Sequence, residues 1–323
     1  LFDSPDFDGH EAVHAFADEA TGLRCIIAVH STSRGPAAGG CRMWPFPTSA
    51  DALQDALRLS RAMSYKNAMA DLDLGGGKAV IIGDSRTQKS PALFEAFGRA
   101  VEAVGGAYWT AEDVGVSPAD LMHARRHTRF VAGLEGHAAA SGDPSPVTAE
   151  GVFRGISLCV RRALDRDLSG VTVAIQGVGH VGAYLAQKLS AAGARLVITD
   201  VNREVLAQVA AQTGAMSAET LPRLRPRIIA GGANNQLADP IIGQTLFDLG
   251  LLYAPDYVIN GGGIINVAGE IRALDAGQAF DPAWVEGKLS RLMITLEEVL
   301  DRSIAERRPT HEVAGEMARE RIA

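Results

Sequence analysis

The chain has 323 residues, 47% of them hydrophobic, which is enough for two domains of about 100–200 residues, each with its own core. Thirty-one Lys and Arg against 38 Asp and Glu give a formal charge of −7 with both signs mixed along the chain, which argues against nucleic-acid partners and anionic membranes. No apolar run approaches the roughly 18–20 residues of a membrane span, and the first residues are acidic where a signal peptide would be basic, so we expect a cytoplasmic protein.

The first elements alternate strand, loop and helix. Residues 23–30 predict a strand, and 35–40 are too rich in glycine and proline to continue it, so we expect a loop that approaches a ligand. Thr48 and Asp51 resemble a helix capping box, and the apolar spacing that follows predicts a helix ending near residues 65–66.

A glycine-rich segment and a carboxylate follow this helix. Residues 74–78 (LGGGK) predict a turn leading into an apolar strand at 79–82, and a helix is expected from 91 to about 104. Residues 108–115 predict a short strand that runs into a turn, where a functional carboxylate such as Asp113 is often placed.

The second half of the sequence predicts a dinucleotide-binding unit. A helix is expected over 149–164, followed by a buried parallel strand at 171–176. The sequence GVGHVG then leads into a helix to about residue 192, a strand at 195–199 and Asp200. Residues 257–260 look strand-like, 261–263 form a glycine loop, and the last fifty or so residues are helical.

The spacing of the three glycines in GVGHVG is typical of a loop that binds a dinucleotide. Gly177 makes a tight turn, Gly179 lets the backbone approach a pyrophosphate, and Gly182 allows close packing of helix on strand. Asp200 stands where an acidic residue accepts hydrogen bonds from the adenosine ribose and repels a 2′-phosphate, which favours NAD over NADP. A merely structural turn would need neither the three glycines nor Asp200.

Metal binding is not expected. Cys25, Cys41 and Cys159 are too widely spaced for a disulfide framework or a zinc site. His123 and His127 share a helix spacing, but no third ligand is evident.

Two lysines have unusual surroundings. Lys66 stands at the end of an amphipathic helix, and Lys78 lies between three glycines and a strand. We expect both to point into one cleft, where a desolvated lysine near a second cation could act as a general base.

Five motifs together closely resemble the leucine, phenylalanine and valine dehydrogenases, a branch of the glutamate dehydrogenase superfamily. They are 36–44 (PAAGGCRMW), 63–66 (MSYK), 75–78 (GGGK), 110–115 (TAEDVG) and 255–260 (PDYVIN). The resemblance covers nearly the whole chain and is closest in motifs to leucine dehydrogenase. It implies an α/β protein of two domains with a cleft between them: an N-terminal substrate-binding and oligomerisation domain (1–142) and a Rossmann-type NAD-binding domain (143–272). Residues 273–323 would form C-terminal helices that pack back on the first domain.

The resemblance also implies roles for individual residues. Lys66 would bind the substrate α-carboxylate, Lys78 would activate water, Asp113 would exchange protons with the amino group, and Asn260 would hold the substrate from the cofactor side. Further substrate-binding positions would be Ala38, Gly39, Gly40, Met63, Ala111, Ile264 and Val267. The cofactor positions would be Thr148, Gly177, Gly179, His180, Val181, Gly182, Asp200, Val201, Asn235 and Asn260.

The implied activity is the reversible, NAD-dependent oxidative deamination of an apolar L-amino acid to a 2-oxo acid and ammonia. The apolar pocket positions offer no partner for a second carboxylate, which disfavours glutamate. Leucine, valine and isoleucine are expected as substrates, with phenylalanine as an alternative. The resemblance further implies a homo-oligomer, and we expect no metal, nucleic-acid or membrane partner.

One interval departs from the family pattern. Between the helix that starts near residue 202 and the strand at 227–231, a doubly wound domain should supply another strand and crossover, and the resembling family carries roughly thirty more residues there. Either the domain has lost a strand or the printed chain lacks residues around 213–217. The undamaged flanking sequence favours the second explanation.

Two other functions compete with the dehydrogenase. A non-catalytic amino-acid or nucleotide sensor could keep the fold, although it would have little need of both Asp113 and Lys78. A 2-hydroxy-acid dehydrogenase would normally use a His and carboxylate pair, which is not evident in the sequence.

Overall fold

The computed structural model describes residues 1–217 and 225–323, which divide into two compact units. Unit 1 comprises Leu1–Asp143, Ile264–Glu286 and Ala318–Ala323, and unit 2 comprises Pro144–Gly263 and Gly287–Met317. The first break lies one residue from the predicted boundary at 142–143. The later boundaries differ, because 264–272 belongs to unit 1 and the predicted C-terminal segment 273–323 is shared between both units.

Unit 1 is built on a five-stranded sheet with the order β1-β2-β4-β3-β5. Its strands are β1 (Ala12–Asp18), β2 (Leu23–Ser31), β3 (Ala37–Trp44), β4 (Gly75–Ile82) and β5 (Tyr108–Glu112). β2 runs antiparallel to β1 and β4, whereas β3 is parallel to both β4 and β5. The carboxyl ends of β3, β4 and β5 therefore meet at one edge of the sheet, which is where ligands bind in many α/β proteins.

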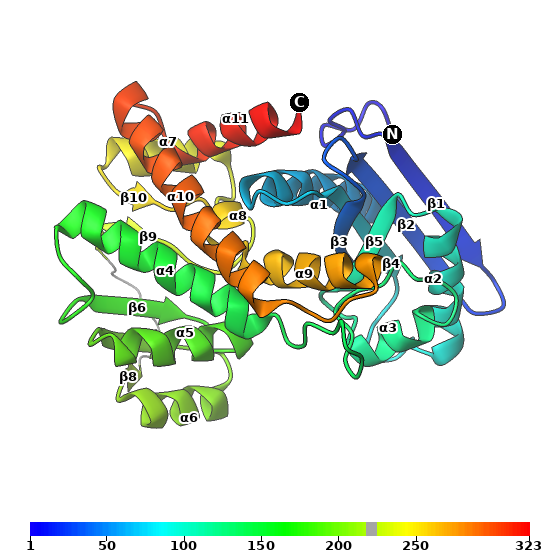
Figure 1. Cartoon of the computed structure of the whole chain (residues 1–323), viewed down its shortest axis with the longest axis horizontal. Coiled ribbons are helices and arrows are strands. Elements are labelled where there is room, and N and C mark those ends of the chain that lie inside the picture. The colour runs from blue at the N-terminus through cyan, green and yellow to red at the C-terminus, as the bar shows by residue number, and fades with distance from the viewer. Residues whose placement is uncertain (218–224) are drawn as a thin grey trace. The chain divides into compact units, whose positions relative to one another are not determined.

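Helices cover both faces of this sheet (Figure 1). α1 (Ser49–Met69) packs through Ala52 and Ala56 on one face, while α2 (Pro91–Ala103) and α3 (Pro118–Ala124) pack on the opposite face. The capping box expected at the start of α1 is present, since Thr48 and Asp51 each accept a hydrogen bond from the other's backbone N–H. α1 ends at Met69, so Lys66 lies in its last turn rather than at its end.

The glycine-rich segments of unit 1 are strands rather than the predicted loop and turn. Gly39 and Gly40 lie within β3, and Gly75–Gly77 within β4. The reason is close packing: a Cβ at Gly76 would lie 2.1 Å from the backbone nitrogen of Ser64, so α1 can rest on β4 only where the strand has no side chain.

Unit 2 contains a parallel three-stranded sheet, β6-β7-β8, which follows the order of the first half of a doubly wound sheet. Its strands are β6 (Thr172–Gln176), β7 (Arg195–Thr199) and β8 (Met216–Ser217), and its helices are α4 (Ser145–Leu164), α5 (His180–Ala191) and α6 (Arg203–Thr213). The short β8 lies in the interval where the sequence departs from the family pattern. Residues 218–224 of that interval lie outside the described residues.

The second half of the doubly wound sheet is reduced. β9 (Ile228–Ile229) pairs in parallel with β10 (Leu252–Tyr253) as a separate two-stranded sheet. In a doubly wound sheet the first strand has a neighbour on each side; among the described residues β6 pairs only with β7. This explains why β6 is largely exposed and not buried on both faces, as its apolar sequence predicted.

The remaining elements are helical. They are α7 (Pro240–Asp248), α8 (Asp256–Ile259), α9 (Gly262–Ala276), α10 (Pro282–Glu306) and α11 (Thr310–Ile322). The strand expected at 257–260 is wrong, because these residues form α8 with Asn260 as its C-cap. Likewise, most of the expected glycine loop at 261–263 is the start of α9. None of the described helices has the length and apolar character needed to cross a membrane.

A buried carboxylate stabilises segment 134–141, which comes shortly before the boundary between the two units at residue 143. Glu270 on α9 is fully buried in unit 1 and accepts hydrogen bonds from the backbone of Leu134 and from the backbone and hydroxyl of Ser141. Burial of a carboxylate costs free energy because the charge loses its hydration, and these three hydrogen bonds offset part of that cost.

Candidate functional site

Several predicted residues of unit 1 share one face of its sheet. Successive strand residues point to opposite faces, and the side chains of Val80 and Ala79 pack with α1 and α2 respectively. By the same alternation Lys78 lies on the α1 face of β4, as Ala38 and Arg42 do on β3. The residues on this face are therefore brought together by strand geometry, not by proximity in sequence.

Lys78 and Asp113 form the centre of this group. The Lys78 Nζ atom lies 2.5 Å from Oδ2 of Asp113, and the Lys78 side chain is only 6% exposed. Burial raises the pKa of the Asp113 carboxyl, but the charges of Lys78 and Arg42 and hydrogen bonds from Lys78 and the Val114 backbone outweigh it, so the pKa lies below its usual value. Asp113 is thus an anion at neutral pH, next to the buried amino group of Lys78.

The adjacent glycines make room for this pair. A Cβ at Gly40 would lie 2.5 Å from the carbonyl oxygen of Glu112 and 2.8 Å from Cβ of Asp113, so only glycine lets the chain after β5 approach β3. The buried Tyr108 hydroxyl donates to the carbonyl oxygen of Gly39 at 2.7 Å and holds this part of β3 in place.

The end of α1 contributes the other predicted residues. Met63 packs close to Gly39, where a Cβ would lie 3.1 Å from its Cγ atom, and Lys66 lies one turn further along the half-buried side of the helix. The apolar positions are Ala38, Ala111 and Val267, which are buried, and Ile264, which is partly buried. Ile264 and Val267 belong to the part of α9 that lies in unit 1.

The glycine fingerprint of unit 2 has the geometry that its spacing predicted. Gly177 has a φ of +90°, and a Cβ at Gly182 would lie 2.1 Å from the carbonyl oxygen of Gly177. Open space surrounds Gly179, the N-cap of α5, and no side chain within the described part of the chain caps this helix. Its N–H groups are therefore available to an anion, and no acidic side chain in the first turn opposes one.

Asp200 follows β7 beside this loop. One carboxylate oxygen accepts a hydrogen bond from the Val178 backbone at 2.7 Å, and the other from Asn202 at 2.8 Å. These two bonds are the first causes of a pKa below the usual value for Asp200, so the side chain is charged at neutral pH. His180, Val181 and Val201, also predicted to contact the cofactor, flank the same loop and strand end.

Asn260 is the predicted residue with an unsatisfied atom. Its amide nitrogen donates to Asn234 at 2.8 Å and to the carbonyl oxygen of Gly232 at 3.2 Å. Its buried Oδ1 has no hydrogen-bond partner among the residues that the structure describes. Asn235 is exposed with a φ of +52°, and the hydroxyl of Thr148 donates to the carbonyl of Pro144 in the first turn of α4.

Comparisons with known proteins agree with these features. Residues 10–130 match the family profile described as "Glu/Leu/Phe/Val dehydrogenase, dimerisation domain", and residues 143–209 match "Glutamate/Leucine/Phenylalanine/Valine dehydrogenase". The chain belongs to this dehydrogenase family. It is therefore an amino-acid dehydrogenase, an oxidoreductase.

Individual relatives cover the whole chain. A leucine dehydrogenase from Geobacillus stearothermophilus is 41% identical over 347 positions, covering 100% of this chain and 93% of the relative. A valine dehydrogenase from Streptomyces coelicolor is 40% identical, covering 100% of this chain and 94% of the relative. The solved structure of L-tryptophan dehydrogenase from Nostoc punctiforme superposes with a TM-score of 0.81 at 34% identity, covering 97% of this chain and 96% of the other.

The alignment with the first of these relatives contains positions that this chain lacks. It spans 347 positions and this dehydrogenase has 323 residues, so at least 24 positions of the relative, the difference between the two, have no counterpart here. This supports the expectation that family members carry residues that this chain lacks.

The sequence did not point to three residues beside the predicted site, which are Arg42, Asp55 and Tyr108. Arg42 binds both Asp113 and Asp55, and Tyr108 holds Gly39. The motif at 36–44 contained a signal for Arg42. In a strand, residues two positions apart lie on the same face, so Arg42 would share the face of Gly40. The interpretation of 35–40 as a loop removed that signal.

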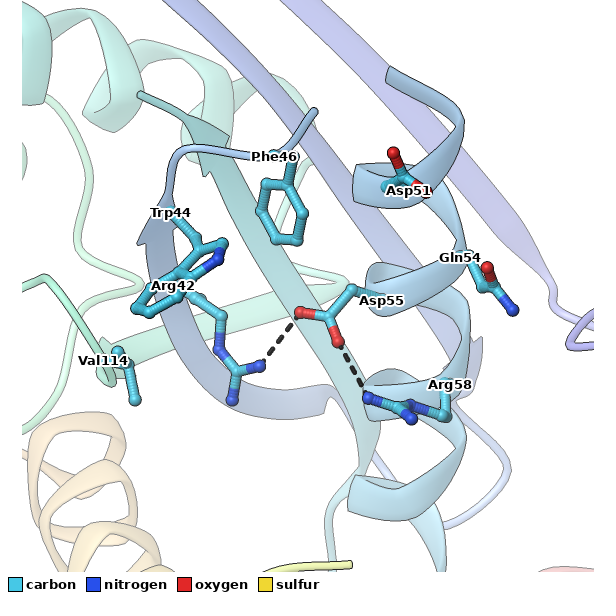
Figure 2. Close-up of a pocket in the computed structure, with 8 residues that line it drawn as sticks. All are labelled: Arg42, Trp44, Phe46, Asp51, Gln54, Asp55, Arg58 and Val114. Carbon is cyan, nitrogen blue, oxygen red and sulfur yellow. Dashed lines mark hydrogen bonds and ion pairs between the residues drawn. The ribbon is translucent and has the colours of Figure 1, made fainter. Parts of the chain in front are cut away.

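A pocket of about 490 Å³ lies beside Arg42 (Figure 2). It is lined by Arg42, Trp44, Phe46, Asp51, Gln54, Asp55, Arg58 and Val114. Lys78 and Asp113 do not line it, so this pocket neighbours the Lys78–Asp113 pair without containing it.

Proposed function

We propose that this dehydrogenase catalyses the NAD-dependent oxidative deamination of an apolar L-amino acid. Substrate, NAD⁺ and water would give the 2-oxo acid, ammonium, NADH and a proton. The buried Lys78–Asp113 pair is the observation that carries the proposal, because it joins an amine and a carboxylate suited to two separate proton transfers.

Each residue of unit 1 has a chemical task in this reaction. Lys66 binds the substrate α-carboxylate, and Asp113 accepts a proton from the substrate ammonium group so that the free amine can be oxidised. Lys78 must first lose its own proton to solvent, and in its neutral form it then takes a proton from the water that attacks the imine carbon. Collapse of the resulting carbinolamine expels ammonia, which recovers a proton from Asp113.

The dinucleotide would bind to the glycine loop of unit 2. The uncapped N-terminus of α5 and the open space at Gly179 fit a pyrophosphate, and Asp200 suits ribose hydroxyls better than a 2′-phosphate. When bound, NAD⁺ would accept the hydride from the substrate Cα. The Oδ1 atom of Asn260, which has no hydrogen-bond partner within the described residues, would offer an acceptor to a polar group of the substrate.

The substrate side chain should be apolar. Ala38, Ala111 and Val267 are buried and carry no hydrogen-bonding group, so a second carboxylate would have no partner among them. We therefore favour leucine, valine and isoleucine, with phenylalanine as the alternative, over glutamate.

We also propose that the dehydrogenase is a homo-oligomer assembled through unit 1. The match of residues 10–130 to a dimerisation domain supports this. Light scattering after size exclusion should give a mass that is a multiple of 34.0 kDa, and a mass equal to the single chain would contradict it.

NADH formation with a panel of L-amino acids tests the activity. We expect turnover with leucine, valine or isoleucine, more slowly with NADP⁺ than with NAD⁺, and little with glutamate. Lys78→Ala should lower kcat by about 10²–10⁴-fold, the usual contribution of a general base.

Lys89→Ala is the matched control. Lys89 makes an ion pair of the same length, 2.5 Å, with Asp120 in the same unit, but it lies outside the proposed site. Equal losses in both variants would contradict a specific role for Lys78. No turnover of any apolar amino acid by the unmodified chain, with binding retained, would instead favour a sensor.

A further inference from the structure

Arg42 joins the Lys78–Asp113 pair to α1. Its Nε atom lies 3.2 Å from Oδ2 of Asp113, and its Nη1 atom lies 3.0 Å from Oδ2 of Asp55. Asp55 is held in turn by Arg58, whose Nη2 atom lies 3.2 Å from Oδ1 of Asp55 (Figure 2). Positive and negative groups therefore alternate from Lys78 to Arg58.

We propose that Arg42 is a positioning residue for the deamination, fixing the Asp113 carboxylate for the substrate amine while Asp55 fixes Arg42. This inference rests on the proposed function, in which Asp113 exchanges protons with the substrate.

The geometry gives Arg42 a defined effect on Asp113. Lys78 and Arg42 both donate to the same oxygen, Oδ2, from two neighbouring strands. Two donors on one oxygen restrict rotation of the carboxylate, and neither of them occupies Oδ1. An approach of the substrate ammonium group to Oδ1 would leave both of these ion pairs in place.

Arg42 also provides the charge that persists through the reaction. Lys78 is proposed to gain and lose a proton in each cycle, and when it is neutral it no longer stabilises the Asp113 anion. A guanidinium stays protonated throughout. Arg42 would therefore keep Asp113 ionised when Lys78 has lost its charge and Asp113 has not yet accepted the proton of the substrate ammonium group.

Several groups near Asp113 could affect the charge of its carboxylate. The ion pairs place Lys78 on β4 and Arg42 on β3 against Asp113, with Asp55 and Arg58 of α1 beyond Arg42. Cys41 and Tyr108 lie close enough to Asp113 to be affected by its charge, and Asp120 is paired with Lys89. Burial raises the pKa values of the Cys41 thiol and the Tyr108 hydroxyl, so neither adds a charge at neutral pH.

Asp55 completes the arrangement. Its side chain is 11% exposed, bonds to both arginines and lines the same pocket, so it balances the charge of Arg42 there. It lies on the same helix as Lys66, three turns earlier. One helix therefore anchors both the proposed carboxylate ligand and the support of the proposed proton acceptor.

The pH dependence of turnover by Arg42→Gln tests the inference. We expect kcat to fall about tenfold or more with a much smaller change in KM, and the acidic limb of kcat/KM to move up by about one pH unit, since an adjacent cation lowers a carboxyl pKa by about 1–3 units. Arg42→Lys should restore the acidic limb but only part of kcat, because lysine lacks the two-pronged geometry. Asp55→Asn should show a weaker form of the same change.

Arg58→Gln is the control, because it removes a cation from the same pocket that bonds to Asp55 but not to Asp113. Its pH profile should match that of the unmodified enzyme. An Arg42→Gln variant with unchanged kcat and acidic limb would overturn the inference, as would an equal shift in Arg58→Gln.

A second measurement separates this inference from the proposed function. The Asp113 carboxyl carbon can be followed by NMR in the full chain labelled at aspartate, with Asp113→Asn to assign its signal. The titration should move to higher pH in Arg42→Gln and not in Arg58→Gln, whether or not any amino acid is turned over. Turnover without this shift would refute the role of Arg42 alone, and the shift without turnover would refute only the proposed reaction.

Discussion

His30 on β2 makes the stability of unit 1 depend on pH. Its imidazole is 8% exposed, with Nδ1 2.8 Å from the Ser64 hydroxyl and Nε2 3.8 Å from Asp8. Burial lowers the pKa of His30 from 6.5 to about 4, helped by the charges of His10 and Arg61 and opposed by Asp8. The folded state therefore holds this ring neutral at pH values where the unfolded chain would protonate it.

The sign and size of the effect follow from proton linkage. Between pH 6.5 and about pH 4 the unfolded state binds more protons at His30 than the folded state, so the free energy of unfolding falls as the pH falls. At about 1.4 kcal/mol per pH unit, the loss is about 2 kcal/mol at pH 5 and about 3 kcal/mol near pH 4. Above pH 6.5 His30 contributes no pH dependence.

Urea unfolding followed by tryptophan fluorescence can measure this. Trp44, Trp109 and Trp284 are the three tryptophans of the chain and all belong to unit 1, so the signal reports that unit. The unmodified protein should lose about 2 kcal/mol more than His30→Gln between pH 7 and pH 5. The exposed His127, changed to Gln, is the control. Parallel curves for the unmodified protein and His30→Gln would refute the argument.

Three further predictions concern packing and cofactor choice. Glu270→Gln should destabilise unit 1 by about 2 kcal/mol in the same fluorescence assay, because hydrogen bonds from segment 134–141 to a buried charge are weakened; no loss would mean that they contribute little. Gly77→Ala should be more destabilising than Gly287→Ala, since a Cβ at Gly77 would lie 2.6 Å from a buried tyrosine ring whereas Gly287 has open space on α10; similar midpoints would contradict this. Asp200→Ser should raise kcat/KM for NADP⁺ relative to NAD⁺ by about tenfold or more, and an unchanged ratio would show that its charge does not select the cofactor.

Local signals in the sequence were sufficient for several features. The capping box of α1 involves only Thr48 and Asp51, which lie within one helical turn, so their bonds form wherever a helix starts there. The glycine fingerprint likewise acts within one turn, and the φ of Gly177 agrees with its expected conformation. The departure from the family pattern was also visible in the sequence, and β6 has the exposure expected of a strand that lacks a neighbour.

Tertiary packing decided the glycine-rich segments and the surroundings of the lysine. The sequence predicted a loop at Gly40 and a turn at Gly76, because glycine weakens a strand. Each instead lies in a strand, at a point where another backbone comes too close for a side chain. Residues 257–260 have the apolar content of a strand and form a helical turn instead. The contact between Lys78 and Asp113 spans 35 positions, and that between Arg42 and Asp113 spans 71. The sequence alone determined which residue types this dehydrogenase has for proton transfer, whereas the pairing of β3 with β4 and β5 decided which of them touch, because strand register depends on partners far along the chain.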